Sequence, residues 1–322
     1  MDDLDPVVDR FAIDLAQRVR DAVAPSLGAP GARKGVGVAP GGDVTMAIDE
    51  IAEQVVEAAC IEAGNIAFYS EDRGYVEIGR PRSILVVDPI DGTRPAAAGL
   101  ESCCVSVAAV PPSPDATLGE VQLGIVHEIK SGHRFIARRG GGVQAEQPVR
   151  LSTNTDLGAL FWTAGLRGRP AMPMTIVLEQ LIDGSGMRGS YFDLGSATFN
   201  MTRIVTGQLD AYVDVGRYVV DVQPSLEAAF RQVGSGAVCT NFPYDVAAAA
   251  LIVEEAGGVV TRPDGTSIAD HPAVGSGDGY GIAVVASASA ALHHRLLEAI
   301  AGGMQRLQAA LGDGITVGRS VE

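Results

Sequence analysis

The stretch SILVVDPIDGT, residues 83–93, decides the predicted fold and site of this chain. Its apolar residues are typical of a buried β-strand, and Asp88 stands where that strand ends. Asp91 follows three positions later, and Gly92 permits a tight turn before Thr93. Carboxylates forced into one loop repel one another unless hard divalent cations neutralise them, so the stretch predicts a metal site. A turn without function is the alternative, because Asp, Pro and Gly also dominate turns.

The residues around this stretch predict helices and strands in the first half of the chain. Helical spacing of apolar residues extends over 4–25, and a second helix follows through Glu57, capped by Asp43 or Thr45. The Gly-rich segment 28–42 between them predicts a mobile loop. β-branched and apolar runs predict strands at 66–69, 83–90, 103–110, 121–129 and 133–139. Together they indicate a largely antiparallel sheet that the two helices cover.

The second half alternates between helical and extended patterns. Helices are predicted around 174–183, 196–206, 244–256 and 288–300, with strands near 210–215, 258–262 and 280–287. This alternation indicates layered α/β structure. We therefore predict two halves, residues 1–150 and 151–322, with the boundary near Leu151.

Composition excludes several classes of protein. The 322 residues are 47% hydrophobic, without an uninterrupted apolar run of eighteen, and the N-terminus lacks the pattern of a secretory signal, so a cytoplasmic protein without a membrane span is predicted. A formal charge of −15 disfavours nucleic acid as a partner. The four cysteines lack the spacing of a zinc site.

Four further segments extend the pattern, and with DPIDGT they resemble the inositol monophosphatase superfamily. They occur in the family's order and, with DPIDGT, span most of residues 1–300: DVTMAID (43–49), YSEDRG (69–74), LGSATFNMTRIVTGQLDAY (194–212) and FPYDVAAAALIVEEAGGVV (242–260). The family has an apolar strand followed by D-P-I/L-D-G-T, and its last motif contains W-D-x-A-A-G.

The resemblance implies a fold and an activity. The fold is an αβαβα sugar-phosphatase sandwich, with a largely antiparallel N-terminal sheet and a mixed C-terminal sheet. The activity is Mg²⁺-dependent, lithium-sensitive hydrolysis of a small phosphate monoester, with inositol monophosphate as the leading substrate. Fructose 1,6-bisphosphate and other sugar or nucleotide 3′-phosphates are alternatives, and a homodimer is expected. An inactive relative that binds a ligand is the alternative from another class, although no metal carboxylate is missing.

The resemblance also assigns roles to individual residues. Two or three Mg²⁺ ions are expected on four carboxylates and one backbone carbonyl, namely Glu71, Asp88, Asp91, Asp245 and the carbonyl of Ile90. Thr93, with Asp49 behind it and Glu71 nearby, would orient and deprotonate the attacking water. Substrate contacts are expected from Gly92, Thr93, Gly195, Ser196, Ala197 and Asp214.

Simpler explanations and departures from the family pattern stay open. Glu71 could be a solvated loop acid, Asp245 a helix cap, Thr93 the end of a turn, and the residues Gly195 to Ala197 a helix start. After DPIDGT the chain has RPAAAGLES, so Arg94 is a candidate substrate contact. An insertion at 217–243 separates Asp214 from Asp245, which leaves Asp221 as a rival for the last metal position.

Overall fold

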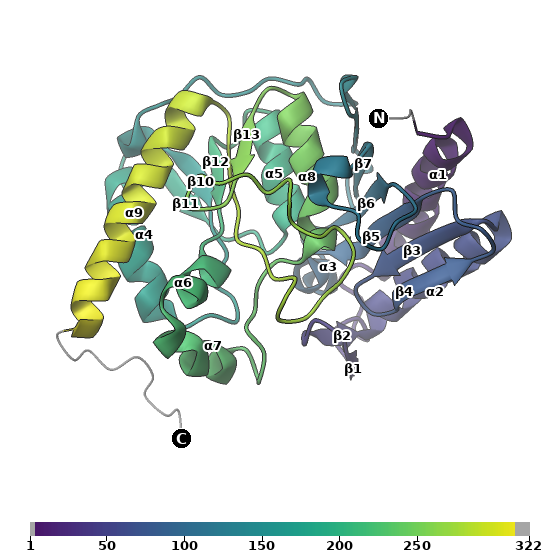
Figure 1. The fold of residues 1–322 in the computed structure, drawn as a ribbon, viewed down its shortest axis with the longest axis horizontal. Helices are drawn as coiled ribbons and strands as arrows, with labels where there is room; N and C mark the ends of the chain where they lie inside the picture. The colour runs from purple at the N-terminus through teal and green to yellow at the C-terminus, as the bar shows by residue number, and fades with distance from the viewer. Residues whose placement is uncertain (1–3, 313–322) are drawn as a thin grey trace.

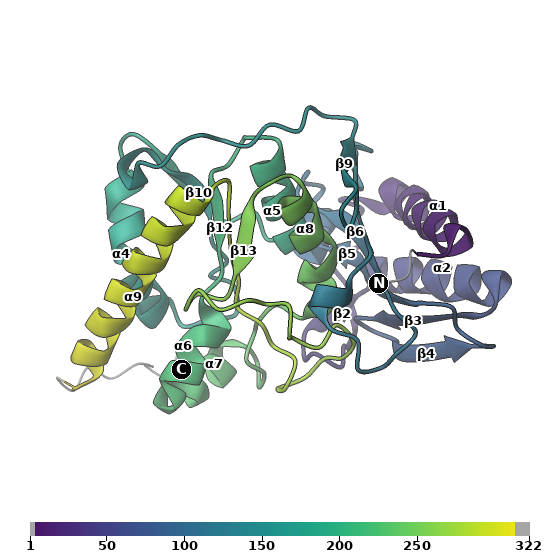
Figure 2. The ribbon, with the colours of Figure 1, turned by 45° about the horizontal axis from the view of Figure 1, so that its top comes forward.

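The chain forms five layers of helices and sheets, seen side by side in Figures 1 and 2. The structure is a computed structural model, and it describes residues 4–312. From one side to the other the layers are α1 with α2, a seven-stranded sheet, α5 with α8, a five-stranded sheet, and α4 with α9. This arrangement confirms the predicted αβαβα sandwich.

Helices α1 (Pro6–Val23) and α2 (Ala47–Ala63) cover the outer face of the seven-stranded sheet. The strand order is β4-β3-β5-β6-β7-β8-β9. Its strands are β3 (Ile66–Ser70), β4 (Gly74–Ile78), β5 (Ile84–Asp91), β6 (Cys104–Val110), β7 (Leu123–Glu128), β8 (Arg134–Arg138) and β9 (Gly142–Ala145). Only β3 and β5 pair in parallel, so the sheet is largely antiparallel as predicted.

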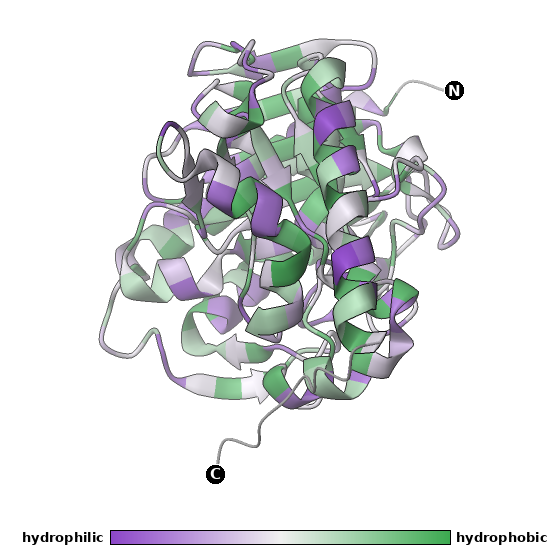
Figure 3. Cartoon of the chain, turned by 90° about the vertical axis from the view of Figure 1, so that its left-hand side faces the viewer, coloured by the Kyte–Doolittle hydropathy of each residue, from purple (hydrophilic) through white to green (hydrophobic). Residues whose placement is uncertain are grey.

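The second sheet is mixed, again as predicted. Its order is β11-β10-β12-β14-β13, and β10 runs parallel to both of its neighbours. The strands are β10 (Phe161–Thr163), β11 (Ser190–Phe192), β12 (Ala211–Val213), β13 (Val259–Thr261) and β14 (Val285–Ser287). Helices α4 (Ala171–Ser185) and α9 (Ala290–Gly312) cover its outer side. Hydrophilic and hydrophobic residues alternate along the outer helices (Figure 3), as expected for helices with one face toward the core.

The middle layer joins the two sheets. Helices α5 (Ala197–Val205) and α8 (Pro243–Glu255) lie between them, and every residue of α5 is buried. A helix between two sheets has no solvent face, so α8 reads as an almost continuous run of alanine and aliphatic residues. Because this core takes residues from both sides of Leu151, the division of the chain there stays a prediction.

Two local predictions need correction. The Gly-rich segment 28–42 is not wholly a loop, since it contains β1 (Gly35–Val38), which pairs with β2 (Val44–Met46). The predicted caps of the second helix are wrong, because α2 begins at Ala47 and the carboxylate of Asp49 accepts the amide of Met46.

Short helices complete the described chain. The insertion at 217–243 contains two helices, α6 (Gly216–Val222) and α7 (Glu227–Val233). The others are α3 (Thr93–Ala98) and 3₁₀ turns at Ala24–Ser26, Leu118–Glu120, Leu157–Ala159 and Pro224–Leu226. Among residues 4–312, no helix is both long enough and apolar enough to cross a membrane.

Candidate active site

A β-bulge at the end of β5 places two carboxylates on the same side of the strand. Asp88 pairs with Ser106 of β6, whereas Asp91 pairs with Cys104, so the register shifts by one residue between them. In a regular strand, residues three apart point to opposite faces. The extra residue of the bulge reverses that alternation and lets both carboxylates face the same space. The bulge therefore explains why D-P-I-D can form a site.

Carboxylates from distant parts of the chain meet at this bulge. Asp88, Asp91 and Asp245 each offer an oxygen, and these oxygens lie within 4.8 Å of one another. Glu71, which directly follows β3, lies close enough to Asp88 and Asp245 for strong electrostatic repulsion. We call these four residues the acidic cage. The sequence predicted all four members, and the structure brings them together.

Asp245 combines two roles that the sequence analysis had judged compatible. It stands at the third position of α8, where its Oδ2 accepts the amide of Phe242 at 2.6 Å. Pro243 at the first turn needs no hydrogen-bond partner for its nitrogen, which suits that position. Asp245 thus caps the helix from within its first turn while contributing an oxygen to the acidic cage.

Asp91 is fixed by the N-terminus of α5. Its Oδ2 accepts the Thr198 amide and hydroxyl, both at 2.6 Å, and the Ser196 hydroxyl at 2.8 Å. Ser196 also caps α5 by accepting the amide of Phe199. The predicted substrate contact Ser196 therefore holds a carboxylate of the cage in place. Thr198 lies within the quoted motif but was not predicted as a site residue.

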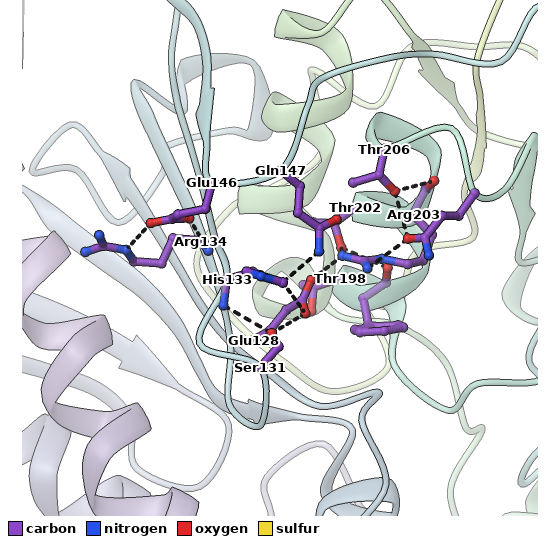
Figure 4. Close-up of polar contacts among 12 residues, drawn as sticks. Glu128, Ser131, His133, Arg134, Glu146, Gln147, Thr198, Thr202, Arg203 and Thr206 are labelled. Carbon is purple, nitrogen blue, oxygen red and sulfur yellow. Dashed lines mark hydrogen bonds and ion pairs between the residues drawn. The ribbon is translucent and has the colours of Figure 1, made fainter.

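A buried network anchors the other end of α5 to the seven-stranded sheet (Figure 4). Arg203 forms an ion pair with Glu128, the last residue of β7, and its guanidinium lies 4.4 Å from the ring centre of Phe199. Ser131 donates a further hydrogen bond to Glu128. With both ends held, α5 can present Thr198 to Asp91 with little freedom.

Burial and mutual repulsion raise the pKa values of the cage. The pKa of Asp88 lies well above its usual range because the carboxyl is buried and because Glu71, Asp91 and Asp245 repel its charge. Burial, followed by the charge of Asp245, raises the pKa of Glu71 in the same way. Burial also raises the pKa of Asp91, although the hydrogen bonds from Thr198 and Ser196 oppose the shift.

No basic side chain of the described residues pairs directly with a carboxylate of the cage. Across residues 4–312, no arginine, lysine or histidine forms an ion pair with Glu71, Asp88, Asp91 or Asp245. Buried carboxylates are normally paired with cations or coordinate metals. Oxygen donors in this number suit a hard divalent cation, so the described residues fit a metal centre.

Asp49 and Thr93 lie beside the cage. The Thr93 hydroxyl donates to the carbonyl of Ile90 at 3.2 Å and also lies within hydrogen-bonding reach of Asp49. Burial raises the pKa of Asp49 to about 7, although its hydrogen bonds to Met46 and Thr93 act in the opposite direction. A carboxyl with a pKa near neutrality can accept and release a proton during a reaction.

Two cavities that share several lining residues open onto this part of the molecule. The smaller, of about 80 Å³, lies over the cage and is lined by Asp88, Gly92, Thr93 and Asp245 among others. The larger, of about 330 Å³, extends toward the C-terminal half and is lined by Gly195, Ser196, Ala197 and Asp214 among others. Every predicted substrate contact therefore lines one of the two cavities.

Two arginines that line both cavities share a single carboxylate. Arg94 of α3 forms two hydrogen bonds to Asp43, and Arg167 of the loop after β10 forms a third at 2.9 Å. Their charges hold the pKa of Asp43 well below its usual range, even though burial opposes this shift. The sequence suggested Arg94 as a substrate contact, whereas Arg167 was missed.

Asp214 is already engaged by the protein. Its Oδ2 accepts Arg169 at 2.7 Å and Asn241 at 3.0 Å, and its Oδ1 accepts the amide of Gly216. Arg169 was not predicted, and because the loop that carries it has no periodic pattern, no signal in the sequence singled it out. Asp221, the rival of Asp245, is exposed on α6 and pairs with Arg217, so it does not join the cage.

The fold and the site together define a layered α/β protein with a buried acidic cage at the junction of its layers. A model of the inositol monophosphatase family matches residues 4–305, so the chain belongs to that family. Members of this family are phosphatases, and the chain is accordingly a phosphoric monoester hydrolase.

Individual relatives agree with this membership. A fructose-1,6-bisphosphatase/inositol-1-monophosphatase of Methanothermobacter thermautotrophicus is 29% identical over 80% of this chain and 85% of its own length. An inositol-1-monophosphatase of Mesorhizobium japonicum is 25% identical over 70% of this chain and 74% of its own. Among solved structures, an IMPase of Thermotoga maritima superimposes with a TM-score of 0.68 at 21% identity, covering 93% of this chain and 99% of its own, which supports the fold.

Proposed function

We propose that this protein is a Mg²⁺-dependent phosphatase that hydrolyses a small phosphate monoester. The observation that carries the proposal is the acidic cage, whose four carboxylates come from three separate segments and form no ion pair with a basic side chain of the described residues. Such a cage is costly unless a cation enters it. Family membership supplies the reaction class.

In this proposal Glu71, Asp88, Asp91 and Asp245 hold two or three Mg²⁺ ions, together with the carbonyl of Ile90. A divalent cation held there would lower the pKa of water and offset the negative charge of the phosphate. The chain's own contribution is rigidity. Asp91 is fixed by Thr198 and Ser196, and Asp245 is fixed by the helix that it caps.

Thr93 and Asp49, with Glu71 nearby, are proposed to orient and deprotonate the attacking water. The Thr93 hydroxyl can accept a hydrogen bond from water while it donates to Ile90 or Asp49. Asp49, with a pKa raised to about 7, could then take up the proton. The amides of Gly92 and Thr93 line the smaller cavity and are proposed to donate to the phosphate oxygens.

Inositol monophosphate is the leading substrate in this proposal, and fructose 1,6-bisphosphate is the second candidate. The larger cavity can receive the alcohol part of either ester, with Gly195, Ala197 and Asp214 along its wall. The relative from Methanothermobacter, whose name covers both activities, supports keeping both substrates. Because Asp214 already accepts several hydrogen bonds, only its Oδ1 has clear capacity for a substrate hydroxyl.

A panel of phosphate esters assayed with Mg²⁺ tests the proposal. It should include inositol 1-phosphate, fructose 1,6-bisphosphate, histidinol phosphate and nucleoside 3′-phosphates, with Li⁺ as inhibitor. Asp91→Asn and Asp245→Asn should abolish turnover with the fold intact, whereas the matched variant Asp221→Asn should keep it. Full activity in Asp91→Asn would refute the metal assignment, and no turnover by wild type would favour an inactive ligand-binding relative.

Two further expectations accompany this proposal. We propose a homodimer, which the family resemblance implies and light scattering of the purified protein would test. We also propose a cytoplasmic location, which the N-terminal sequence predicts and fractionation of the host cells would test.

A further inference from the structure

The insertion at 217–243 is a packed part of the C-terminal half. It contains α6 and α7, of which α6 packs against α4 (Figure 1). Several of its apolar side chains are buried in the core that α4 and α9 share, namely Val219, Val220, Leu226, Phe230 and Val238. A segment held by its own buried residues can shape a cavity at low entropic cost, because it loses little freedom when a ligand binds.

The end of this insertion forms one wall of the larger cavity. Most residues of 233–241 line that cavity, whereas no residue of 217–243, all of which the structure describes, lines the smaller cavity over the acidic cage. In the proposed function the phosphate lies in the smaller cavity and the alcohol part of the ester in the larger one. We call residues 233–241 the insertion wall, and it faces the alcohol part of the ester.

The insertion wall touches loops from both halves of the chain. Ala237 lies so close to Gly42, in the turn between β1 and β2, that a Cβ on Gly42 would be 2.6 Å from the Cβ of Ala237. Cys239 lies as close to Gly168, in the loop after β10, where an added Cβ would be 2.7 Å from the Cβ of Cys239. Neither glycine has space for a side chain, and both also line the cavity. The insertion wall therefore bounds the cavity between these two loops.

Asn241 connects the insertion wall to the carboxylate that is proposed to bind a substrate hydroxyl. Its Nδ2 donates to Oδ2 of Asp214 and to the hydroxyl of Tyr212, both at 3.0 Å. The backbone of Asn241 is also fixed, because its carbonyl accepts the amide of Ile282 at 2.9 Å. The insertion wall thus helps to hold Asp214 in place.

The groups that the insertion wall adds to the cavity are polar but uncharged. Ser235 and Thr240 offer hydroxyls and Asn241 an amide, and no acidic or basic side chain of the described residues 217–243 lines the cavity. Hydroxyls both donate and accept hydrogen bonds, so they can pair with the hydroxyls of a polyol. The cavity volume of about 330 Å³ lies near the lower end of the range of about 300–1,000 Å³ for small-molecule sites. A hydroxylated alcohol with one ring fits such a cavity better than a nucleoside with a sugar and a base.

From these contacts we infer that the insertion wall determines specificity for the alcohol part of the substrate. It admits phosphate esters of a hydroxylated single-ring alcohol and excludes esters of a nucleoside. The inference rests on the proposed function and deepens it by naming the class of alcohol. It also assigns a role to a segment that departs from the family pattern.

The test changes the size of Val233, the residue at the end of α7. Val233 lines the larger cavity and is 48% exposed, whereas Val222 on α6 is 46% exposed and lines neither cavity. The assay measures kcat/KM with Mg²⁺ for inositol 1-phosphate, glycerol 1-phosphate and adenosine 3′-phosphate. The wild-type protein should prefer inositol 1-phosphate over adenosine 3′-phosphate.

The two Val233 variants should change selectivity in opposite directions. Val233→Trp narrows the cavity, so kcat/KM for inositol 1-phosphate relative to glycerol 1-phosphate should fall roughly ten- to two-hundredfold, the range for steric discrimination in a pocket. Val233→Ala widens the cavity, so kcat/KM for adenosine 3′-phosphate relative to inositol 1-phosphate should rise several-fold. Val222→Trp should change neither ratio. Calorimetry with Mg²⁺ and inorganic phosphate should give the wild-type affinity in all three variants, because the insertion wall does not line the smaller cavity.

Several results would overturn the inference. They are unchanged ratios in both Val233 variants, equal changes of the ratios in Val222→Trp, a parallel loss of affinity for inorganic phosphate, or a wild-type preference for adenosine 3′-phosphate. Failure of the proposed function is distinguishable from these results. If the wild-type protein hydrolyses no ester, the proposed function and the inference fail together, whereas turnover with unchanged ratios overturns the inference alone.

Discussion

Arg169 and Asp214 form a buried ion pair, with Nη2 and Oδ2 2.7 Å apart and side chains only 5% and 1% exposed. Arg169 also donates to the carbonyls of Gly165 and Cys239, so its guanidinium joins three separate segments. Arg169→Met would leave Asp214 without its cation in a buried place. We predict a loss of about 3–5 kcal/mol in the free energy of unfolding, measured by urea denaturation.

Arg217→Met is the control for that prediction. Arg217 forms the pair with Asp221 on α6, where the carboxylate is 50% exposed, and such pairs contribute about 0–1 kcal/mol. Equal losses of unfolding free energy in Arg169→Met and Arg217→Met would show that burial of the ion pair does not determine its contribution.

The turn at Gly92 should tolerate no side chain. Its φ is +91°, and a Cβ built there would lie 2.4 Å from the backbone carbonyl oxygen of Ser102. Gly92→Ala combines an unfavourable backbone conformation with a clash against main chain, and we predict a loss of roughly 2–5 kcal/mol together with loss of turnover. Gly140→Ala separates the two effects, because Gly140 has a φ of +74° but open space around it. If both variants lose the same free energy of unfolding, the clash with Ser102 does not cause the loss in Gly92→Ala.

Two members of the cage were predictable from a local pattern, whereas Glu71 and the metal role of Asp245 were predicted from the family resemblance. Asp88 and Asp91 end an apolar strand, and Asp245 begins a helix of alanine and aliphatic residues. Arg167 and Arg169, which lie in the cavity wall, lacked such signals. Arg169 acts through Asp214, 45 residues away, and Arg167 acts through Asp43, 124 residues away, so neither contact follows from spacing along the chain.

Secondary structure was predictable to a similar extent. Long amphipathic helices and buried strands were found, because their periods extend over many residues. The seven-residue helices α6 and α7 and the three-residue strands β10 and β11 were missed, since so few residues hardly establish a period. The start of α2 was misplaced because Asp43, although aspartate is a common helix N-cap, instead forms hydrogen bonds with Arg94 and Arg167.

Divalent cations should stabilise this protein strongly. The buried carboxylates of the acidic cage repel one another in the metal-free protein, and a cation that binds only the folded state adds free energy of folding. At a Mg²⁺ concentration one hundred times its dissociation constant, we predict about 2.7 kcal/mol, seen as a higher unfolding temperature. NaCl at equal ionic strength should not reproduce the effect. Asp91→Asn should weaken it, and Asp221→Asn should leave it unchanged. A shift that persists fully in Asp91→Asn would argue against the cage.

Glu53, a buried acid outside the acidic cage, should make the stability of the metal-free protein depend on pH. Its Oε2 accepts the hydroxyl of Ser70 at 2.7 Å and its Oε1 accepts the amide of Asp72 at 3.0 Å. Burial raises its pKa to about 7 from an ordinary value of 4.5, despite these hydrogen bonds. The folded state therefore binds the proton more tightly than the unfolded state does.

The direction of the pH dependence follows from this difference in proton affinity between the folded and unfolded states. Stability contributed by a protonated Glu53 is fully present below the unfolded pKa and is lost as the pH rises through the folded pKa, so the free energy of unfolding should fall between about pH 4.5 and 7. The slope from one group is at most about 1.4 kcal/mol per pH unit. Glu53→Gln should flatten the decline measured by urea denaturation without metal, whereas Glu62→Gln, an exposed change on the same helix, should not. Part of the slope should persist in Glu53→Gln, because burial also raises the pKa of Asp49 to about 7. A slope identical to wild type would show that Glu53 is charged in the folded protein throughout this range.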